Sequence, residues 1–189
     1  MNSKLKIFAE FILLVLLLCF YNGCKRQTSR QETSPSNANV PVSSPAPSAS
    51  PESKASAYGW TLQDNQRARL SDYLGKVVVL DFYATWCEPC RDEMASMQRL
   101  QQQLAGRPFK ILLVNYGESR ARVGEFVKRE AVGLPILLDP NQDAPRAWRV
   151  RVLPSSFLVG PDGRVRYSVI GEIDWAGVEA VNLVRGLLP

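Results

Sequence analysis

From residue 76 to the C-terminus, short apolar runs alternate with longer stretches in which an apolar residue recurs every three or four positions. The short runs, rich in branched and aromatic side chains, are typical of strands buried on both faces, and the longer spacing is typical of amphipathic helices. The pattern predicts strands at 76–84, 110–116 and 135–139, a pair of strands within 155–171, and helices at 90–106, 119–132, 143–150 and 174–188.

Turn and capping residues mark where several of these elements begin and end. The segment 161–163, with the sequence PDG, predicts a hairpin turn between the last two strands. Pro89 belongs in the first turn of the first helix, and Asp174 is the expected N-cap of the last helix. The order strand–helix–strand, followed by a hairpin and a helix, predicts an α/β fold with a mixed central β-sheet flanked by helices.

The N-terminal segment has a different pattern, typical of an export signal. Lys4 and Lys6 precede an apolar run over residues 11–21, which is shorter than the about 20 apolar residues that a membrane span needs. The sequence YNGC that ends at Cys24 resembles a bacterial lipobox, in which a small residue precedes a cysteine that is lipidated. We therefore expect a signal peptide over residues 1–23 and a lipid on Cys24, with an uncleaved, short signal anchor as the alternative.

The next segment has the composition of a tether. Residues 24–57 are mostly Ser, Pro, Ala, Asn, Gln and Thr, which provide too little apolar surface to offset the entropy cost of folding. We expect a disordered tether here, followed by one folded domain over residues 58–189. Both readings of the N-terminus predict a domain in the cell envelope, exported and membrane-anchored, which faces the periplasm or the cell exterior.

Charge and composition exclude several classes of function. The formal net charge is +5, but six Lys/Arg and three Asp/Glu fall within residues 1–57, so the domain carries only 17 − 15 = +2. This is the surface of an ordinary solvated domain, and it disfavours nucleic-acid binding. The chain has no histidine, which excludes Ser-His and Cys-His catalysis and histidine-ligated zinc.

Four cysteines are present, and two of them form a close pair. Cleavage before Cys24 would remove Cys19 and leave Cys87 and Cys90 as the thiols of the domain. A zinc site commonly uses two such pairs or histidines, so we expect no metal. Cys87 is predicted at a strand-to-helix junction, where free helix N–H groups and the helix dipole stabilise a thiolate. Cys90, one turn later, could attack a mixed disulfide on Cys87, whereas two buried core thiols are the alternative.

Four stretches together resemble a known family over nearly the whole domain. They read VVVLDFYATWCEPCRDEM, VNYGES, PILLD and LPSSFLVGPDGRV in chain order, and they are similar to the ResA/TlpA-type branch of extracytoplasmic thiol-disulfide oxidoreductases in the thioredoxin superfamily. The resemblance implies a thioredoxin fold with the extra elements of that branch, no cofactor, and a cis peptide bond before Pro154 facing the cysteines. It places substrate contacts at Trp86, Leu153 and Pro154.

Two carboxylates are candidates for a proton acceptor that serves Cys90. Asp81 is the only charge in its apolar strand, and burial would raise its pKa; the alternative is an Asp that reaches water at the strand end. Glu93 lies one helical turn after Cys90 and matches an acidic residue near the cysteines of ResA-like proteins; the alternative is an ordinary first-turn Glu. Which of the two accepts the proton stays open.

The expected activity is reduction of disulfides in exported proteins by dithiol exchange. The negative charge of Glu88 between the cysteines opposes a strongly acidic thiol on Cys87, unless Glu88 points into solvent. The resemblance suggests apocytochrome c as a client, a membrane electron donor of the thiol-disulfide relay type and a monomeric chain. The alternatives are a general periplasmic oxidase or isomerase, and a client-binding thioredoxin-like module without redox turnover.

Overall fold

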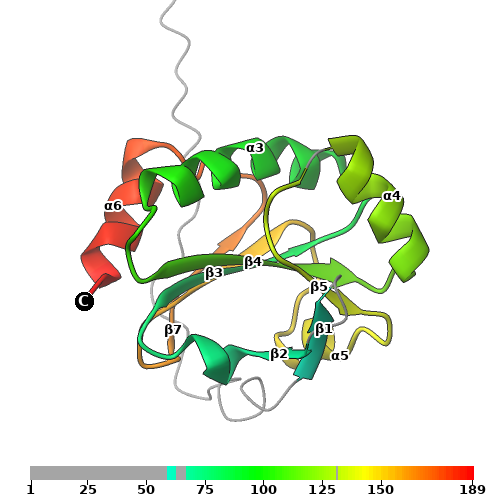
Figure 1. The fold of residues 1–189 in the computed structure, drawn as a ribbon, viewed down its shortest axis with the longest axis horizontal. Helices are drawn as coiled ribbons and strands as arrows, with labels where there is room; N and C mark the ends of the chain where they lie inside the picture. Colours follow the sequence, from blue (N-terminus) through cyan, green and yellow to red (C-terminus); the bar gives the residue numbers. More distant parts are fainter. Residues whose placement is uncertain (1–58, 63–66, 131) are drawn as a thin grey trace, which may run out of the picture. The chain divides into compact units, whose positions relative to one another are not determined.

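The computed structural model describes residues 59–62, 67–130 and 132–189, so the predicted signal peptide, lipidation site and tether lie outside the described residues. A seven-stranded sheet runs through this domain in the order β2-β1-β5-β4-β3-β6-β7 (Figure 1). Its strands are β1 (Gly59–Leu62), β2 (Arg67–Arg69), β3 (Val77–Tyr83), β4 (Phe109–Tyr116), β5 (Ile136–Asp139), β6 (Ser155–Val159) and β7 (Val165–Ile170). The helices are the 3-10 helix η1 (Leu70–Tyr73) and the α-helices α3 (Glu88–Gln103), α4 (Arg120–Glu130), α5 (Asp143–Ala147) and α6 (Val178–Leu187).

The sheet is mixed, as predicted. Strands β3, β4 and β5 are parallel, with Val79 beside Ile111 and Val114 beside Leu137. Strand β6 pairs antiparallel with β3, and β7 pairs antiparallel with β6. The carboxyl ends of the three parallel strands therefore meet at one edge, which is where binding and catalytic loops gather in open α/β sheets.

Helices cover both faces of the central strands, which explains why β3 is apolar at almost every position. Val77, Val79 and Tyr83 pack into one core cluster with Met94 and Met97 of α3. Val78, Leu80 and Phe82 point to the other face, where they join residues of η1 and α5. Figure 1 shows α3, α4 and α6 on the first face and α5 on the second. Alternation along a strand therefore places Asp81 on the face that α3 covers.

Some predicted boundaries were wrong, and the last helix differs most. Helix α6 begins at Val178 with Gly177 as its N-cap, not with Asp174. The carboxylate of Asp174 instead accepts the N–H of Ala176 at 3.1 Å, and its carbonyl accepts the N–H of Gly177 at 3.0 Å. These bonds form a separate turn ahead of the helix, because Asp side chains bond local backbone N–H groups as readily in turns as at caps.

Strands β1 and β2, at one edge of the sheet, were not predicted from the sequence. The pattern from residue 76 onward did not include β1 and β2, which are only four and three residues long. Helix α3 begins at Glu88, ahead of the predicted 90, and α5 ends at Ala147, ahead of the predicted 150. Within the ranges that the structure describes, no helix is both long enough and apolar enough to cross a membrane.

Candidate active site

The two cysteines lie where the sequence places them, at the junction of β3 and α3. Cys87 is the N-cap residue of α3, and Pro89 follows within the first turn. A disulfide joins Cys87 to Cys90, with the two Cα atoms 5.3 Å apart. The N–H of Cys90 donates to the sulfur of Cys87 at 3.3 Å, so the Cys87 sulfur takes one of the free N–H groups at the helix start. The same N–H would stabilise a thiolate on Cys87.

Access to the two sulfurs is unequal and restricted. Cys87 is 5% exposed and Cys90 is 1% exposed, so Cys87 is the sulfur that a client can reach first. Trp86, directly before Cys87, is 62% exposed. Glu88 is exposed as well, which agrees with the alternative that it points into solvent. The site is therefore a nearly buried disulfide with a large aromatic side chain beside it on the surface.

The proline loop lies at the same end of the sheet as the cysteines. The Leu153–Pro154 peptide bond is cis, as the resemblance implied. Strand β6 starts at Ser155, which pairs with Phe82 near the carboxyl end of β3, so Pro154 lies next to the strand end that leads to Cys87. Val152 is 53% exposed, and the sequence reasoning did not single it out. Trp86 and Val152 are thus two exposed apolar side chains on loops at this end of the sheet.

Asp81 is buried and does not reach water. It is 1% exposed and accepts a hydrogen bond from the hydroxyl of Ser156 on the neighbouring strand at 2.7 Å. Burial raises the pKa of Asp81 to about 7, against the lowering effect of the Ser156 hydrogen bond. Asp81 is therefore a group that exchanges a proton near neutral pH.

Glu93 is also buried, one turn after Cys90. It is 2% exposed; one carboxyl oxygen accepts the indole N–H of Trp175, and the other has no hydrogen-bond partner. Burial, followed by the nearby charge of Asp81, raises the pKa of Glu93 to about 10. The structure thus brings both predicted carboxylates into one buried pair, in which Glu93 holds its proton at neutral pH.

Besides Val152, three hydrogen-bonding residues of this site were missed by sequence reasoning. Trp175 reaches Glu93 across 82 residues of chain, and Ser156 reaches Asp81 across 75. Glu118 reaches the loop before the cysteines across 33 residues, by accepting the N–H of Thr85. No local sequence pattern predicts such contacts. The only indication for Glu118 was its place in the VNYGES stretch on which the family resemblance is based.

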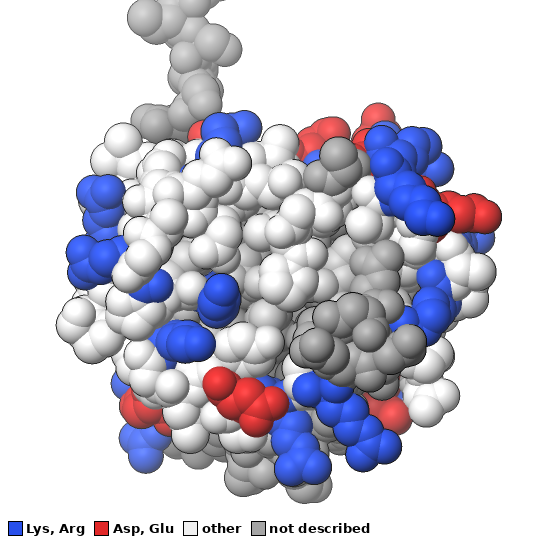
Figure 2. Space-filling view, in the orientation of Figure 1, with Lys and Arg blue, Asp and Glu red and all other residues white. Residues whose placement is uncertain are grey.

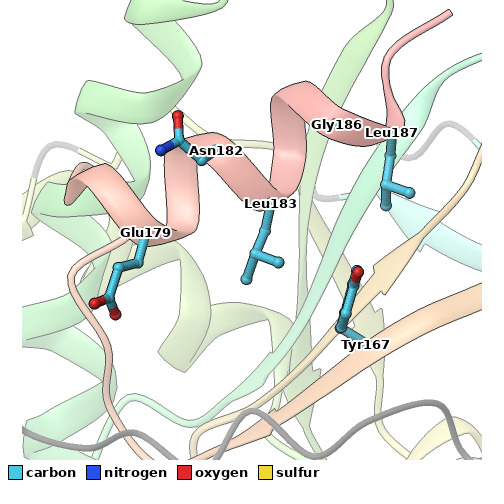
Figure 3. A pocket seen from close by; sticks show the side chains of 6 residues that line it. All are labelled: Tyr167, Glu179, Asn182, Leu183, Gly186 and Leu187. Carbon is cyan, nitrogen blue, oxygen red and sulfur yellow. The ribbon is translucent and has the colours of Figure 1, made fainter.

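Other surface features lie apart from these residues. A groove of about 460 Å³ lies between α6 and β7, lined by Tyr167, Glu179, Asn182, Leu183, Gly186 and Leu187 (Figure 3). None of the predicted site residues lines it. On the face shown in Figure 2, Lys and Arg form several separate groups with Asp and Glu among them, so this face has no continuous basic surface. Among the described residues, no group of three or more Cys, Asp or Glu could hold a metal ion.

Known proteins with similar sequences are thiol-disulfide oxidoreductases. The thiol-disulfide oxidoreductase ResA of Bacillus subtilis (strain 168) is 35% identical over 132 residues, which cover 68% of this chain and 74% of that protein. ResA of Geobacillus kaustophilus (strain HTA426) is 37% identical over 111 residues, which cover 59% of this chain and 64% of that protein. The family model described as AhpC/TSA family matches residues 49–168, more than half of the chain.

Solved structures agree on the fold. A thiol:disulfide interchange protein of the thioredoxin family from Chlorobium tepidum TLS superposes with a TM-score of 0.62 at 23% identity, covering 70% of this chain and 94% of that one. MTB dsbF superposes with a TM-score of 0.63 at 22% identity, covering 70% and 96%. The helix-capping Cys87, the Cys87–Cys90 disulfide and the cis bond before Pro154 lie on this thioredoxin fold. The chain belongs to the AhpC/TSA family of thioredoxin-like proteins and is a thiol-disulfide oxidoreductase.

Proposed function

We propose that this protein is a membrane-tethered, extracytoplasmic reductase that transfers two electrons from Cys87 and Cys90 to disulfides of exported proteins. The observation that carries the proposal is the pair itself: a helix-capping sulfur on Cys87, with the more deeply buried Cys90 three residues later and the buried acid Glu93 three residues after that. The curated relatives named ResA support the reaction type. The apolar run before Cys24 supports export and tethering.

The exchange proceeds in two steps. The Cys87 thiolate attacks one sulfur of the client disulfide, which forms a mixed disulfide and releases the other client sulfur as a thiolate that takes up a proton. Cys90 then loses its proton and attacks the Cys87 sulfur, which releases the second client thiol and forms the Cys87–Cys90 bond. The client gains two electrons and the protein loses two, so a membrane dithiol donor must reduce the pair again.

Asp81 is the acceptor of the Cys90 proton in this proposal. A carboxylic acid with a pKa of about 7 is partly ionised at neutral pH and can take up a proton, whereas an acid with a pKa of about 10 already holds one. Glu93 is one turn from Cys90 but is held protonated, and one of its oxygens accepts the indole N–H of Trp175. Glu93 is therefore neutral at pH 7 and is not the proton acceptor in this proposal.

Trp86, Val152 and the Leu153–Pro154 loop form the client-contacting surface in this proposal. The two exposed apolar side chains can pack on the client, and the backbone of Leu153 can pair with an extended client segment as an added strand. Apocytochrome c, whose cysteines must be reduced before haem attachment, is the proposed client class. The runner-up function is a general oxidase or isomerase that uses the same pair in the opposite direction.

The direct test of the proposed function uses a client peptide. Fully reduced protein is mixed with a disulfide-closed peptide that carries the two haem-binding cysteines of an apocytochrome c, and the thiols of both are quantified by alkylation and mass spectrometry. We expect the peptide to become a dithiol while Cys87 and Cys90 become a disulfide. If oxidised protein instead closes the reduced peptide under the same buffer, the oxidase reading replaces the reductase reading.

We expect Asp81→Asn to slow release of the client from the mixed disulfide by about tenfold at pH 7, because an amide cannot take the Cys90 proton. In the unchanged protein the release rate should rise through pH 7, where Asp81 ionises. In the variant it should rise only toward about pH 8.5, where a thiol ionises by itself. Stopped-flow measurement across pH checks this, with Asp92→Asn, which changes an exposed acid on α3, as the control. A normal profile for Asp81→Asn with a slowed Glu93→Gln would reverse the assignment.

A further inference from the structure

The carboxylate of Glu118 is tied to the loop that carries Cys87. Glu118 lies two residues after the end of β4, and its side chain is 8% exposed. One oxygen accepts the backbone N–H of Thr85 at 2.7 Å and the amide N–H of Asn115 at 2.8 Å. The other accepts the hydroxyl of Thr85 at 2.6 Å and lies 3.1 Å from Nε of Arg122. The carboxylate therefore accepts three hydrogen bonds and faces one cationic side chain.

The residue that Glu118 holds is two positions before Cys87. Within the loop, the N–H of Cys87 donates to the carbonyl of Ala84 at 3.1 Å, which closes a tight turn around Thr85 and Trp86. Apart from that turn, Thr85 is held by its two bonds to Glu118 and by Nε of Arg122 on α4, which donates to the Thr85 hydroxyl at 3.3 Å. A carboxylate from the loop after β4 thus holds the chain two residues before Cys87.

Glu118 is itself held in place by its own loop. Its backbone N–H donates to the side-chain oxygen of Asn115 at 2.9 Å. Gly117 has a φ of +76°, and a Cβ there would collide with the side chain of Gln142, from the loop after β5. The loop after β4 is therefore hydrogen-bonded to the loop after β3 and packs closely against the loop after β5. A rigid support of this kind keeps a reactive group in its working geometry.

We propose that Glu118 is a positioning residue for the exchange reaction, which holds the Thr85 loop so that the Cys87 sulfur stays at the start of α3 when the disulfide is open. In the oxidised protein the bond to Cys90 also fixes this sulfur. In the dithiol protein that bond is gone, so the Glu118 contacts carry the geometry. Loss of Glu118 should therefore displace the Cys87 sulfur more in the dithiol form than in the disulfide form. Thiol-disulfide exchange by this pair is the only activity that such a role requires.

Two other roles for Glu118 predict different results. If its negative charge mattered most, its removal would favour a thiolate on Cys87 and would speed the reaction of this sulfur. If it only stabilised the fold, its removal would lower the melting temperature and leave the reactivity of folded protein unchanged. Positioning predicts slower reaction, because the sulfur loses its alignment with the free N–H groups of the helix.

The test measures alkylation of Cys87 by iodoacetamide in the reduced full chain at pH 7, with peptide mapping to separate it from the other cysteines. We expect Glu118→Gln to slow alkylation by about three- to tenfold, which corresponds to loss of part of a charge-assisted hydrogen bond. The ratio of dithiol to disulfide protein in a fixed dithiothreitol buffer should fall by a similar factor. The exposed acid Glu125 on α4 provides the matched control, Glu125→Gln, which should leave both values unchanged.

Thr85 variants keep the proposal testable if Glu118→Gln does not fold. Thr85→Val removes the hydroxyl and leaves the Glu118 charge in place, so it should slow alkylation by about two- to threefold. Thr85→Ser keeps the hydroxyl and should react as the unchanged protein does. Faster alkylation of Glu118→Gln, or unchanged alkylation in both Glu118→Gln and Thr85→Val, would overturn the proposal.

Discussion

Replacing Cys87 by serine should reduce exchange with a client disulfide by at least about a thousandfold, because the nucleophile is lost and a hydroxyl cannot form the mixed disulfide. Replacing Cys90 by serine should have a different outcome. The Cys87 thiolate can still attack, but nothing can release the client, so one client per protein should accumulate as a covalent complex. Non-reducing gels and intact-mass measurement distinguish the two variants.

The difference between the cysteines follows from their positions. Cys87 caps α3 and is the more exposed sulfur, whereas Cys90 is 1% exposed and lies behind it. Iodoacetamide should accordingly modify Cys87 faster than Cys90 in the reduced protein. Cys24→Ser, which leaves the pair intact, is the control and should exchange as the unchanged purified protein does. A covalent client complex formed by Cys87→Ser through Cys90 would contradict these roles.

The second large effect that we expect is on stability. Glu93→Gln should raise the free energy of unfolding of the oxidised protein by about 3 kcal/mol at pH 7. In the folded protein the pKa of Glu93 is raised to about 10, whereas an unfolded Glu ionises near its ordinary value of 4.5. Between these two values the folded state holds a proton that the unfolded state has released. Unfolding is then favoured as pH rises, so stability falls from about pH 4.5 upward. A glutamine keeps an oxygen for Trp175 and has no proton to lose.

Chemical denaturation at several pH values measures this effect. The unchanged protein should lose stability as pH rises from 5 to 9, and Glu93→Gln should lose clearly less over the same range. Asp81 contributes a slope of the same sign in both proteins, but only up to about pH 7, where its raised pKa lies. The exposed Glu125→Gln variant should follow the unchanged protein. Equal slopes for Glu93→Gln and the unchanged protein would show that Glu93 is ionised in the folded state.

Local patterns in the sequence predicted the part of the site that local forces build. The apolar run before Cys87, the proline in the first helical turn and the three-to-four spacing after it specify a strand, a helix and the cap between them. The cis peptide bond between Leu153 and Pro154 could be predicted only from the family resemblance, because a cis X–Pro bond has no reliable local sequence signature.

The remaining features depend on contacts between distant parts of the chain. Asp174 had the sequence features of an N-cap, yet its turn places Trp175 beside Glu93 and the helix starts later. The carboxylates were identified as candidates, but only the packing of α3 on β3 shows that they are a buried pair. The hydrogen bonds between Thr85 and Glu118, which are 33 residues apart, likewise form because the neighbouring parallel strands β3 and β4 bring their following loops together.

Whether the protein acts as a reductant or an oxidant depends on how strongly its dithiol form is stabilised. Strong oxidants stabilise their dithiol form through a very acidic thiolate. Here the Cys87 sulfur has one helix N–H and no histidine beside it, so the stabilisation should be moderate. The reduction potentials of thioredoxin and DsbA, about −270 and −120 mV, differ by about 7 kcal/mol for two electrons, so the two roles are well separated.

The reduction potential of the Cys87–Cys90 pair is the most direct test of the central claim. The protein is equilibrated in a series of dithiothreitol or glutathione buffers, quenched by alkylation, and the fraction of dithiol at these two residues is measured by mass spectrometry. The account predicts a potential near that of thioredoxin, at about −270 mV. A potential near that of DsbA, at about −120 mV, would contradict it and would make the protein an oxidase.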